Sequence, residues 1–173
     1  MEKELLAGLI TAVLIAVALG LIWMGWRNRL RRQSDIEPLP PVPAELGEPL
    51  LTAEGQYVAS TTAGDWLDRI AVHGLGIRTN AQLSVHSQGV LLDRSGAAPL
   101  FIPAAGLNGV RQDSGMAGKF VEKDGLLVLT WALGTHQLDT GFRTRRAADK
   151  QALFQKLQEL ISAGPQADAQ SGK

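Results

Sequence analysis

Residues 64–74, GDWLDRIAVHG, gather the side chains of this sequence that could most readily do chemistry. Asp65, Asp68 and His73 could act as acids or bases, and a serine held beside them would complete a hydrolytic triad. Such a serine needs a sharp turn or a neighbouring base, and the sequence contains no G-x-S-x-G elbow. We therefore predict no catalytic residue and expect that the protein is not an enzyme.

The histidines are the other candidates for chemistry, because imidazole is a common metal ligand. His73, His86 and His136 are far apart, and no H-x-x-x-H spacing brings two of them onto one helical face. The sequence has no cysteine, which excludes disulfides, thiolate catalysis and cysteine-based metal clusters. It has no phosphate-loop or dinucleotide fingerprint either. We predict no metal site and no cofactor.

Binding is a better interpretation of residues 64–74, because they lie in an expected connection, residues 63–80, that is longer than a hairpin needs. Trp66 is the informative residue, since large amphipathic side chains often anchor interfaces. The candidate contact residues here are Asp65, Trp66, Asp68, Arg69, His73 and Arg78. A structural interpretation stays open, in which residues 66–70 form a helical turn and Trp66 fills the interior. Asp65 then caps that turn, and Asp68 pairs with an arginine.

A second candidate surface lies in residues 140–146, TGFRTRR. Its candidate contact residues are Phe142, Arg143, Arg145 and Arg146. Cations at the start of a helix oppose the helix dipole, so their placement there suggests a use. They could pair with Asp65 and Asp68, or present positive charge to a partner that carries carboxylates.

Residues 5–26 run for 22 positions without a charge. At about 1.5 Å per residue they form roughly 33 Å of helix, which is enough for a hydrocarbon core of ~30 Å. A cleaved signal peptide would have a basic start, a shorter apolar region and a small-residue cleavage site. The start here is MEKE and the apolar run ends in WMGWRNR, so a retained transmembrane helix is the prediction.

The flanks of this helix predict its orientation. Four cations follow it, which are Arg27, Arg29, Arg31 and Arg32, whereas Lys3 is the one cation before it. The side with more Lys and Arg usually stays cytoplasmic, so we expect the N-terminus outside and the remaining chain in the cytoplasm at the inner (plasma) membrane. The same four arginines could also contact anionic lipid headgroups at the membrane surface.

Small residues recur every four positions within the helix, at Gly8, Ala12, Ala16 and Gly20. Such a stripe lets two helices approach closely, so a homodimer through the transmembrane helix is possible.

The regions on either side of the expected domain have the composition of linkers. Residues 27–53 join the basic flank to a stretch that holds five of the eight prolines, which favours an extended spacer. Residues 163–173 are small and polar, and we expect a disordered tail. From Ser34 onward, 12 Lys and Arg stand against 15 Asp and Glu, so the net charge of −3 argues against nucleic-acid binding.

The folded part is expected at residues 54–162, with strands first and one helix last. Strands are predicted at 54–62, 81–87, 89–94, 99–103, 107–112, 118–123, 126–132 and 136–142. Asp124 and Gly125 predict a two-residue hairpin between the sixth and seventh of these, and 133–135 predict a turn before the eighth.

The helix is predicted from a candidate N-cap at Thr144 to a stop at Gly164 and Pro165. Leu153, Leu157 and Leu160 belong to its apolar stripe. Short strands followed by an amphipathic helix predict a mainly β fold, a barrel of about seven antiparallel strands whose open end the helix covers.

This plan resembles the pleckstrin-homology (PH) superfold. The strings GDWLDRIAVHGLG, LFIPAAGLNGVRQDSGMAGK and LLVLTWALGTHQLDTGFR resemble those of actinobacterial single-pass membrane proteins with a bacterial PH-like domain. Members are loosely labelled export or transporter proteins, although one span cannot form a translocation path alone. The resemblance implies a PH-like fold for residues 54–162 and brings no catalytic residues.

Together these observations predict a membrane-anchored, non-catalytic module that docks or scaffolds a protein partner at the inner membrane. The alternative is lipid or small-ligand sensing by the PH-like barrel. The sequence does not identify the partner.

Overall fold

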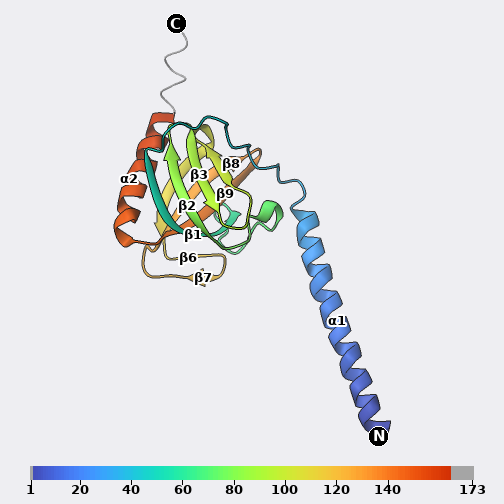
Figure 1. Ribbon diagram of the computed structural model, residues 1–173. Coiled ribbons are helices and arrows are strands. Elements are labelled where there is room, and N and C mark those ends of the chain that lie inside the picture. The colour runs from blue at the N-terminus through green and yellow to red at the C-terminus, as the bar shows by residue number, and fades with distance from the viewer. Residues whose placement is uncertain (1, 165–173) are drawn as a thin grey trace. The chain divides into compact units, whose positions relative to one another are not determined.

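The computed structural model describes residues 2–164 as two units that divide after Asp35 (Figure 1). The first unit is the helix α1 (Glu2–Arg32) with the residues that follow it. The segment Leu6–Asn28 of this helix has a mean hydropathy of 2.5 and is long and apolar enough to cross a membrane. The stripe Gly8, Ala12, Ala16 and Gly20 lies on its exposed surface. The prediction of an apolar N-terminal helix is confirmed.

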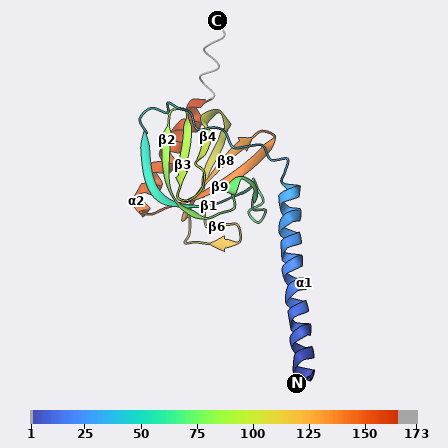
Figure 2. The ribbon, with the colours of Figure 1, turned by 45° about the vertical axis from the view of Figure 1, so that its right-hand side comes forward.

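The second unit is built around a seven-stranded antiparallel sheet with the order β4-β3-β2-β1-β9-β8-β5 (Figures 1 and 2). Its strands are β1 (Leu51–Thr62), β2 (Thr79–His86), β3 (Gly89–Arg94), β4 (Leu100–Pro103), β5 (Leu107–Asp113), β8 (Leu126–Leu133) and β9 (His136–Thr144). The sheet stays open, because β4 and β5 form its two edges. The predicted β architecture is confirmed: an open antiparallel sheet of seven strands followed by one C-terminal helix.

Buried and exposed side chains alternate along much of β2, whereas β8 and β9 carry continuous runs of buried residues at the centre of the sheet. Turn chemistry explains two of the hairpins. β2 and β3 pair from His86↔Gly89, and β8 and β9 from Leu133↔His136, as predicted. Gly134 has a φ of 56° in the second turn, a conformation that glycine adopts at low cost. Trp131, Tyr57 and Phe142 are completely buried between the strands and form the centre of the core.

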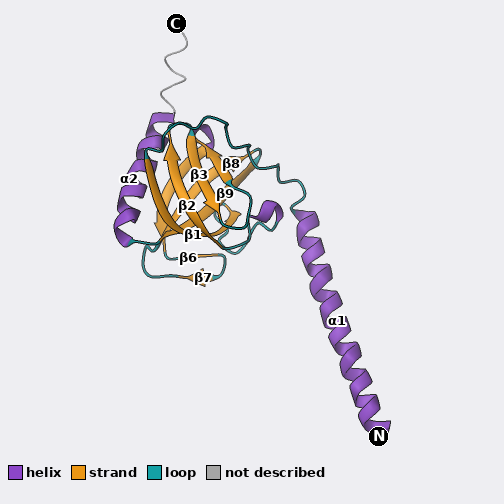
Figure 3. Cartoon of the chain, in the orientation of Figure 1, coloured by secondary structure: helices purple, strands orange, loops and turns teal. Residues whose placement is uncertain are grey.

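The helix α2 (Ala147–Ala163) covers the core through Leu153, Leu157 and Leu160, as the apolar stripe predicted (Figure 3). It packs against β1, β5 and β9. The predicted N-cap at Thr144 is wrong, because Thr144 still pairs with Gly55 in the sheet. Arg146 precedes the helix in an extended conformation and makes no side-chain cap, so sheet pairing outweighs the local capping preference.

The predicted hairpin at Asp124 and Gly125 is also wrong. Two short strands, β6 (Gly115–Met116) and β7 (Lys119–Phe120), instead pair with each other outside the main sheet. Their turn is formed by Ala117 and Gly118, which both have positive φ, as a two-residue hairpin turn requires. β8 has no hairpin partner before it, since it pairs with β5 and β9. Asp124 does adopt a positive φ, but in an irregular loop.

The compact unit begins at Ile36, whereas the sequence predicted a free spacer up to residue 53. Ile36 is 6% exposed in the core, and Leu39 packs against the same cluster. The Gln88 side chain donates to the carbonyl of Glu45, and the amide of Leu50 donates to Val85. Residues 36–50 therefore lie along the sheet, because apolar residues between the prolines give them contacts that proline content alone does not reveal. At the other end, helix α2 continues through Ala163 and Gly164 is its C-cap, while residues 165–173 of the predicted tail lie outside the described residues.

Candidate functional site

The connection between β1 and β2, residues 63–78, folds back along β1 instead of projecting as a free loop. The amide of Ile70 donates to the carbonyl of Ser60 (2.9 Å), and the amide of Ser60 donates to Leu75 (2.8 Å). Ile70 and Leu75 are buried. This backbone pairing makes the connection a rigid support for the side chains at its turn.

Asp65 and Asp68 shape that turn. The Oδ1 atom of Asp65 accepts hydrogen bonds from the amides of Leu67 (3.0 Å) and Asp68 (3.2 Å). Thr62 donates its hydroxyl proton to Asp68 (2.7 Å). Asp65 therefore has the capping role that the structural interpretation gave it, although residues 65–70 form a turn and no helix.

Trp66 does not fill the interior, because it is 41% exposed. Its ring packs against Phe120 of β7, with the ring centroids 5.5 Å apart, and Phe120 is itself 77% exposed. Leu67, beside Trp66, is 59% exposed. We call Trp66, Leu67 and Phe120 the apolar tip. The sequence analysis found Trp66 but missed Phe120, because β6 and β7 were not predicted as a hairpin.

Hydrogen bonds hold the two halves of the apolar tip together. The amide of Ala117 donates to the carbonyl of Trp66 (2.7 Å). Arg69 donates to the carbonyl of Ala117 (3.1 Å) and to that of Gly76 (3.3 Å). Arg69, predicted as a contact residue, therefore joins the connection to the β6–β7 hairpin.

His73 contacts the segment that enters the domain. It lies in the left-handed region with a φ of 54°, within the short helix η1 (Val72–Gly74). Its Nε2 atom lies 3.0 Å from the carbonyl oxygen of Ile36. Arg78, the last predicted residue of this set, donates to the exposed side chain of Gln56.

The arginine corner, Arg143, Arg145 and Arg146, lies at the other end of the β1–β9 pair. Thr62 pairs with Leu138 near the connection, whereas Gly55 pairs with Thr144 at the corner. Seven residues of strand separate the two ends by about 23 Å. The fourth predicted residue of this surface, Phe142, is fully buried and cannot contact a partner.

Each arginine of the corner has a carboxylate partner other than Asp65 or Asp68. Arg143 binds Glu122 (2.8 Å), Arg145 binds Glu54 (3.2 Å) and Arg146 binds Asp149 (2.9 Å). Hydrogen bonds from its own backbone amide and from Arg143 hold the pKa of Glu122 below its usual value.

A groove of about 1010 Å³ runs beside the arginine corner. Most of its lining is polar or charged, including Glu54, Gln56, Asp93, Glu122, Arg143, Arg145 and Lys150. Both cations and carboxylates line it, so it suits a polar partner that carries charges of both signs. We call it the corner groove.

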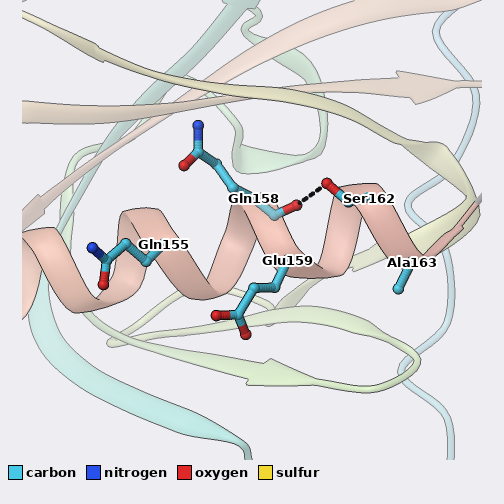
Figure 4. Close-up of a pocket in the computed structure, with 5 residues that line it drawn as sticks. All are labelled: Gln155, Gln158, Glu159, Ser162 and Ala163. Atoms are coloured by element: carbon cyan, nitrogen blue, oxygen red, sulfur yellow. Dashed lines mark hydrogen bonds between the residues drawn. The ribbon is translucent and has the colours of Figure 1, made fainter.

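A second hollow, of about 580 Å³, lies on the exposed side of α2 (Figure 4). Gln155, Gln158, Glu159, Ser162 and Ala163 line it, and the Ser162 hydroxyl donates to the carbonyl of Gln158 within the helix. These side chains come from one face of one helix and do not converge on a point. The hollow is therefore an ordinary feature of a solvated helix.

An ion pair that no local sequence pattern indicated joins the half-exposed Arg111 to the buried Asp139. Arg111 of β5 donates two hydrogen bonds to Asp139 of β9, at 3.1 and 2.9 Å. Thr130 also donates to Asp139 (2.6 Å), as does the amide of Gly64 (3.3 Å). Burial alone would raise the pKa of Asp139, but the hydrogen bonds from Arg111 and Thr130 hold it below its usual value. The pair fixes the start of the 63–78 connection.

Arg94, unlike Arg111, is a buried cation. It is 2% exposed, lies 4.8 Å from the ring of Tyr57, and donates to the carbonyls of Gly74 and Ala98. Burial raises the pKa of Tyr57 to about 12, and its hydroxyl donates to the carbonyl of Leu75. Both side chains thus fix the end of the same connection from inside.

Within residues 2–164 no three His, Asp or Glu side chains lie close enough to hold a metal ion. Of the predicted membrane-surface residues, Arg27 lies 5.4 Å from the ring of Trp23, and Arg31 lies in the same helix. The side chains of Arg29 and Arg32 lie outside the described part.

The sequence pattern of the family described as bacterial PH domain-like matches residues 36–158. The chain therefore belongs to this family, and the bacterial PH-like part of the resemblance is confirmed. Domains of the PH type are generally binding modules rather than enzymes. The family match also begins at Ile36, where the compact unit of the structure begins.

Among solved structures, the chain is similar to Vav1 inhibited by an allosteric inhibitor, with 21% identity and a TM-score of 0.40. The similarity covers 79% of this chain and 32% of that one, so this chain spans about a third of its length. No curated protein matches the sequence.

Proposed function

We propose that this protein is a membrane-anchored, non-catalytic module that holds a protein partner beside the membrane. The fold is of a binding type, and the helix Leu6–Asn28 provides a candidate anchor. The observation that carries the proposal is the corner groove, whose exposed charges of both signs converge from β1, β9 and the loop before β8.

The corner groove fits a protein segment better than a small ligand. Small-ligand pockets are mostly apolar, with a few convergent polar groups, and rarely exceed about 1000 Å³. This groove is lined mostly by polar and charged side chains. Arg145 and Glu54 are 77% and 71% exposed at their side chains, so a partner can compete for both at little cost.

We further propose the orientation that the flanking arginines predict, with the N-terminus outside and the PH-like domain in the cytoplasm. A cysteine introduced at the exposed position 145 would then resist a membrane-impermeant thiol reagent in intact cells and react after permeabilisation. Reaction in intact cells would reverse this orientation.

Docking through the corner groove predicts that Arg145→Glu loses a partner that the full-length wild type retains in a pull-down from native membranes. The repulsion between the new carboxylate and Glu54 is exposed, so its effect on stability is less than about 1 kcal/mol. Circular dichroism and thermal melting check that the fold is intact.

Two further variants make the pull-down decisive. Glu54→Arg combined with Arg145→Glu restores the internal ion pair with the charges exchanged. If the double variant regains the partner, the single variant acted through the fold and the groove is not the docking site. If Trp66→Ala loses the partner and Arg145→Glu retains it, the contact lies at the apolar tip instead.

A further inference from the structure

The apolar tip is the part of the domain surface that the corner groove leaves unexplained. Trp66, Leu67 and Phe120 come from two segments about fifty residues apart, yet they form one contiguous exposed cluster. Each is large and apolar, and exposure of such side chains to water costs free energy unless something covers them.

The backbone beneath the apolar tip is held rigidly. The Ala117 amide and the Arg69 guanidinium cross-link the two segments, and Asp65 fixes the turn that presents Trp66 and Leu67. The cluster is therefore presented in one conformation and loses little conformational entropy when it is covered.

The path of the chain indicates what covers it. Only Gln33, Ser34 and Asp35 separate the end of α1 at Arg32 from Ile36, which is buried in the domain. Four steps along the backbone span at most about 14 Å. With α1 as the proposed anchor, this short tether gives the domain a high effective concentration for the bilayer.

The point of attachment lies against the connection that carries the tip. Ile36 contacts His73, and a Cβ on Gly134 in the β8–β9 turn would overlap the Glu37 carboxylate. The β8–β9 turn and residues 63–78 share one end of the β1–β9 pair. The chain therefore enters the domain beside the connection that carries Trp66 and Leu67.

We propose that the apolar tip inserts into the interfacial region of the bilayer in which the protein is anchored. Tryptophan and phenylalanine rings are favoured at that depth, and the tip carries no charge of its own. Asp65 and Asp68 flank Trp66 and Leu67, whereas Arg69 follows Asp68 and Lys119 precedes Phe120, so the charges beside the tip residues in the sequence are of both signs and nearly cancel. We therefore expect insertion to depend on apolar area rather than on anionic lipid.

The absence of cysteine from the sequence permits a direct test with single nitroxide labels on the full-length protein. The labelled variants are Leu67→Cys and Phe120→Cys, with Arg145→Cys as the matched exposed control. Each is reconstituted into phosphatidylcholine vesicles, and the label's collisions with oxygen and with a water-soluble nickel chelate are measured. We expect labels at 67 and 120 to collide several-fold less with the chelate than the label at 145.

Equal chelate accessibility at 67, 120 and 145 overturns the proposal. So does protection that requires phosphatidylglycerol and disappears at high salt, because that dependence indicates a charge contact. Labels that are accessible in vesicles but protected in native membranes identify the tip as a protein contact, which also overturns it. In the Leu67→Cys background, Phe120→Ser should restore part of the chelate access if the tip inserts as a unit.

These measurements do not depend on the partner. Loss of binding in the Arg145→Glu pull-down and protection of the labels at 67 and 120 can each occur without the other, so the two proposals fail separately.

Discussion

Individual polar residues decide how the 63–78 connection is held. Asp139 joins Arg111, Thr130 and the amide of Gly64, while Arg94 and Tyr57 reach Gly74 and Leu75 from the core. Buried polar groups with satisfied hydrogen bonds fix one arrangement, and loss of one partner leaves the others unpaired in a dry interior. The rigidity of the apolar tip thus originates mainly in the buried side chains of Asp139, Arg94 and Tyr57.

Asp139→Asn should lower the free energy of unfolding by about 2 kcal/mol at pH 7, because Arg111 loses its charged acceptor at a site where Asp139 is 4% exposed. Urea unfolding measures this. The surface variant Lys156→Gln, which breaks an exposed pair with Glu159, should change the same quantity by less than about 0.5 kcal/mol.

The same pair predicts a dependence on pH. The folded-state pKa of Asp139 is lowered, so its stabilisation is present above the unfolded value of about 3.9 and is lost as the pH falls through the folded value. The wild type should therefore lose stability more steeply than Asp139→Asn below about pH 4. If the free energies of unfolding of the two proteins fall in parallel below about pH 4, Asp139 does not cause the acid destabilisation.

At the scale of elements, the close approach of the paired strands β1 and β9 limits side-chain size. A Cβ at Gly55 of β1 would lie 2.2 Å from the Arg143 carbonyl oxygen and 2.6 Å from the Phe142 ring. The close approach of the two strands therefore requires glycine at position 55, and this requirement does not come from a positive φ.

Gly55→Ala should destabilise the domain by about 1–3 kcal/mol through this overlap, as measured by thermal or urea unfolding. Gly109→Ala in β5 is the matched control, because its Cβ would meet Thr130 at 3.9 Å, an ordinary contact. If both substitutions lower the free energy of unfolding equally, strand propensity explains the loss of stability, and the steric overlap at Gly55 does not.

At the scale of the whole molecule, the domain includes the segment that the proline content marks as a spacer. Ile36 and Leu39 pack against the core, and the chain that leaves the apolar helix is therefore bound to the domain within a few residues. Only Gln33, Ser34 and Asp35 separate the end of α1 from this packed segment, so the proline-rich stretch belongs to the domain.

Ile36→Ala should lower the free energy of unfolding by about 2–3 kcal/mol, because a buried side chain is truncated. Val42→Ala in the same segment is the control, since Val42 is 37% exposed and should cost less than about 1 kcal/mol. Equal, small effects would show that residues 36–50 contribute no stability and act as a free spacer.

The sequence by itself determined the features that depend on local pattern. An uncharged run of 22 residues predicts the apolar helix, alternation with glycine turns predicts the β2–β3 and β8–β9 hairpins, and a 3.6-residue stripe predicts α2. Each signal lies within a short window, where backbone geometry and the burial of one face suffice to define the element.

Only the tertiary structure decided which surfaces those elements make. Trp66 packs on the surface against Phe120, which comes from another strand. Arg143 pairs with Glu122 and Arg145 pairs with Glu54 because the fold brings these side chains close together. Phe142 and Ile36 are buried for the same kind of reason. Such contacts join residues far apart in the sequence, and no local periodicity encodes them, because they depend on the pairing of all seven strands at once.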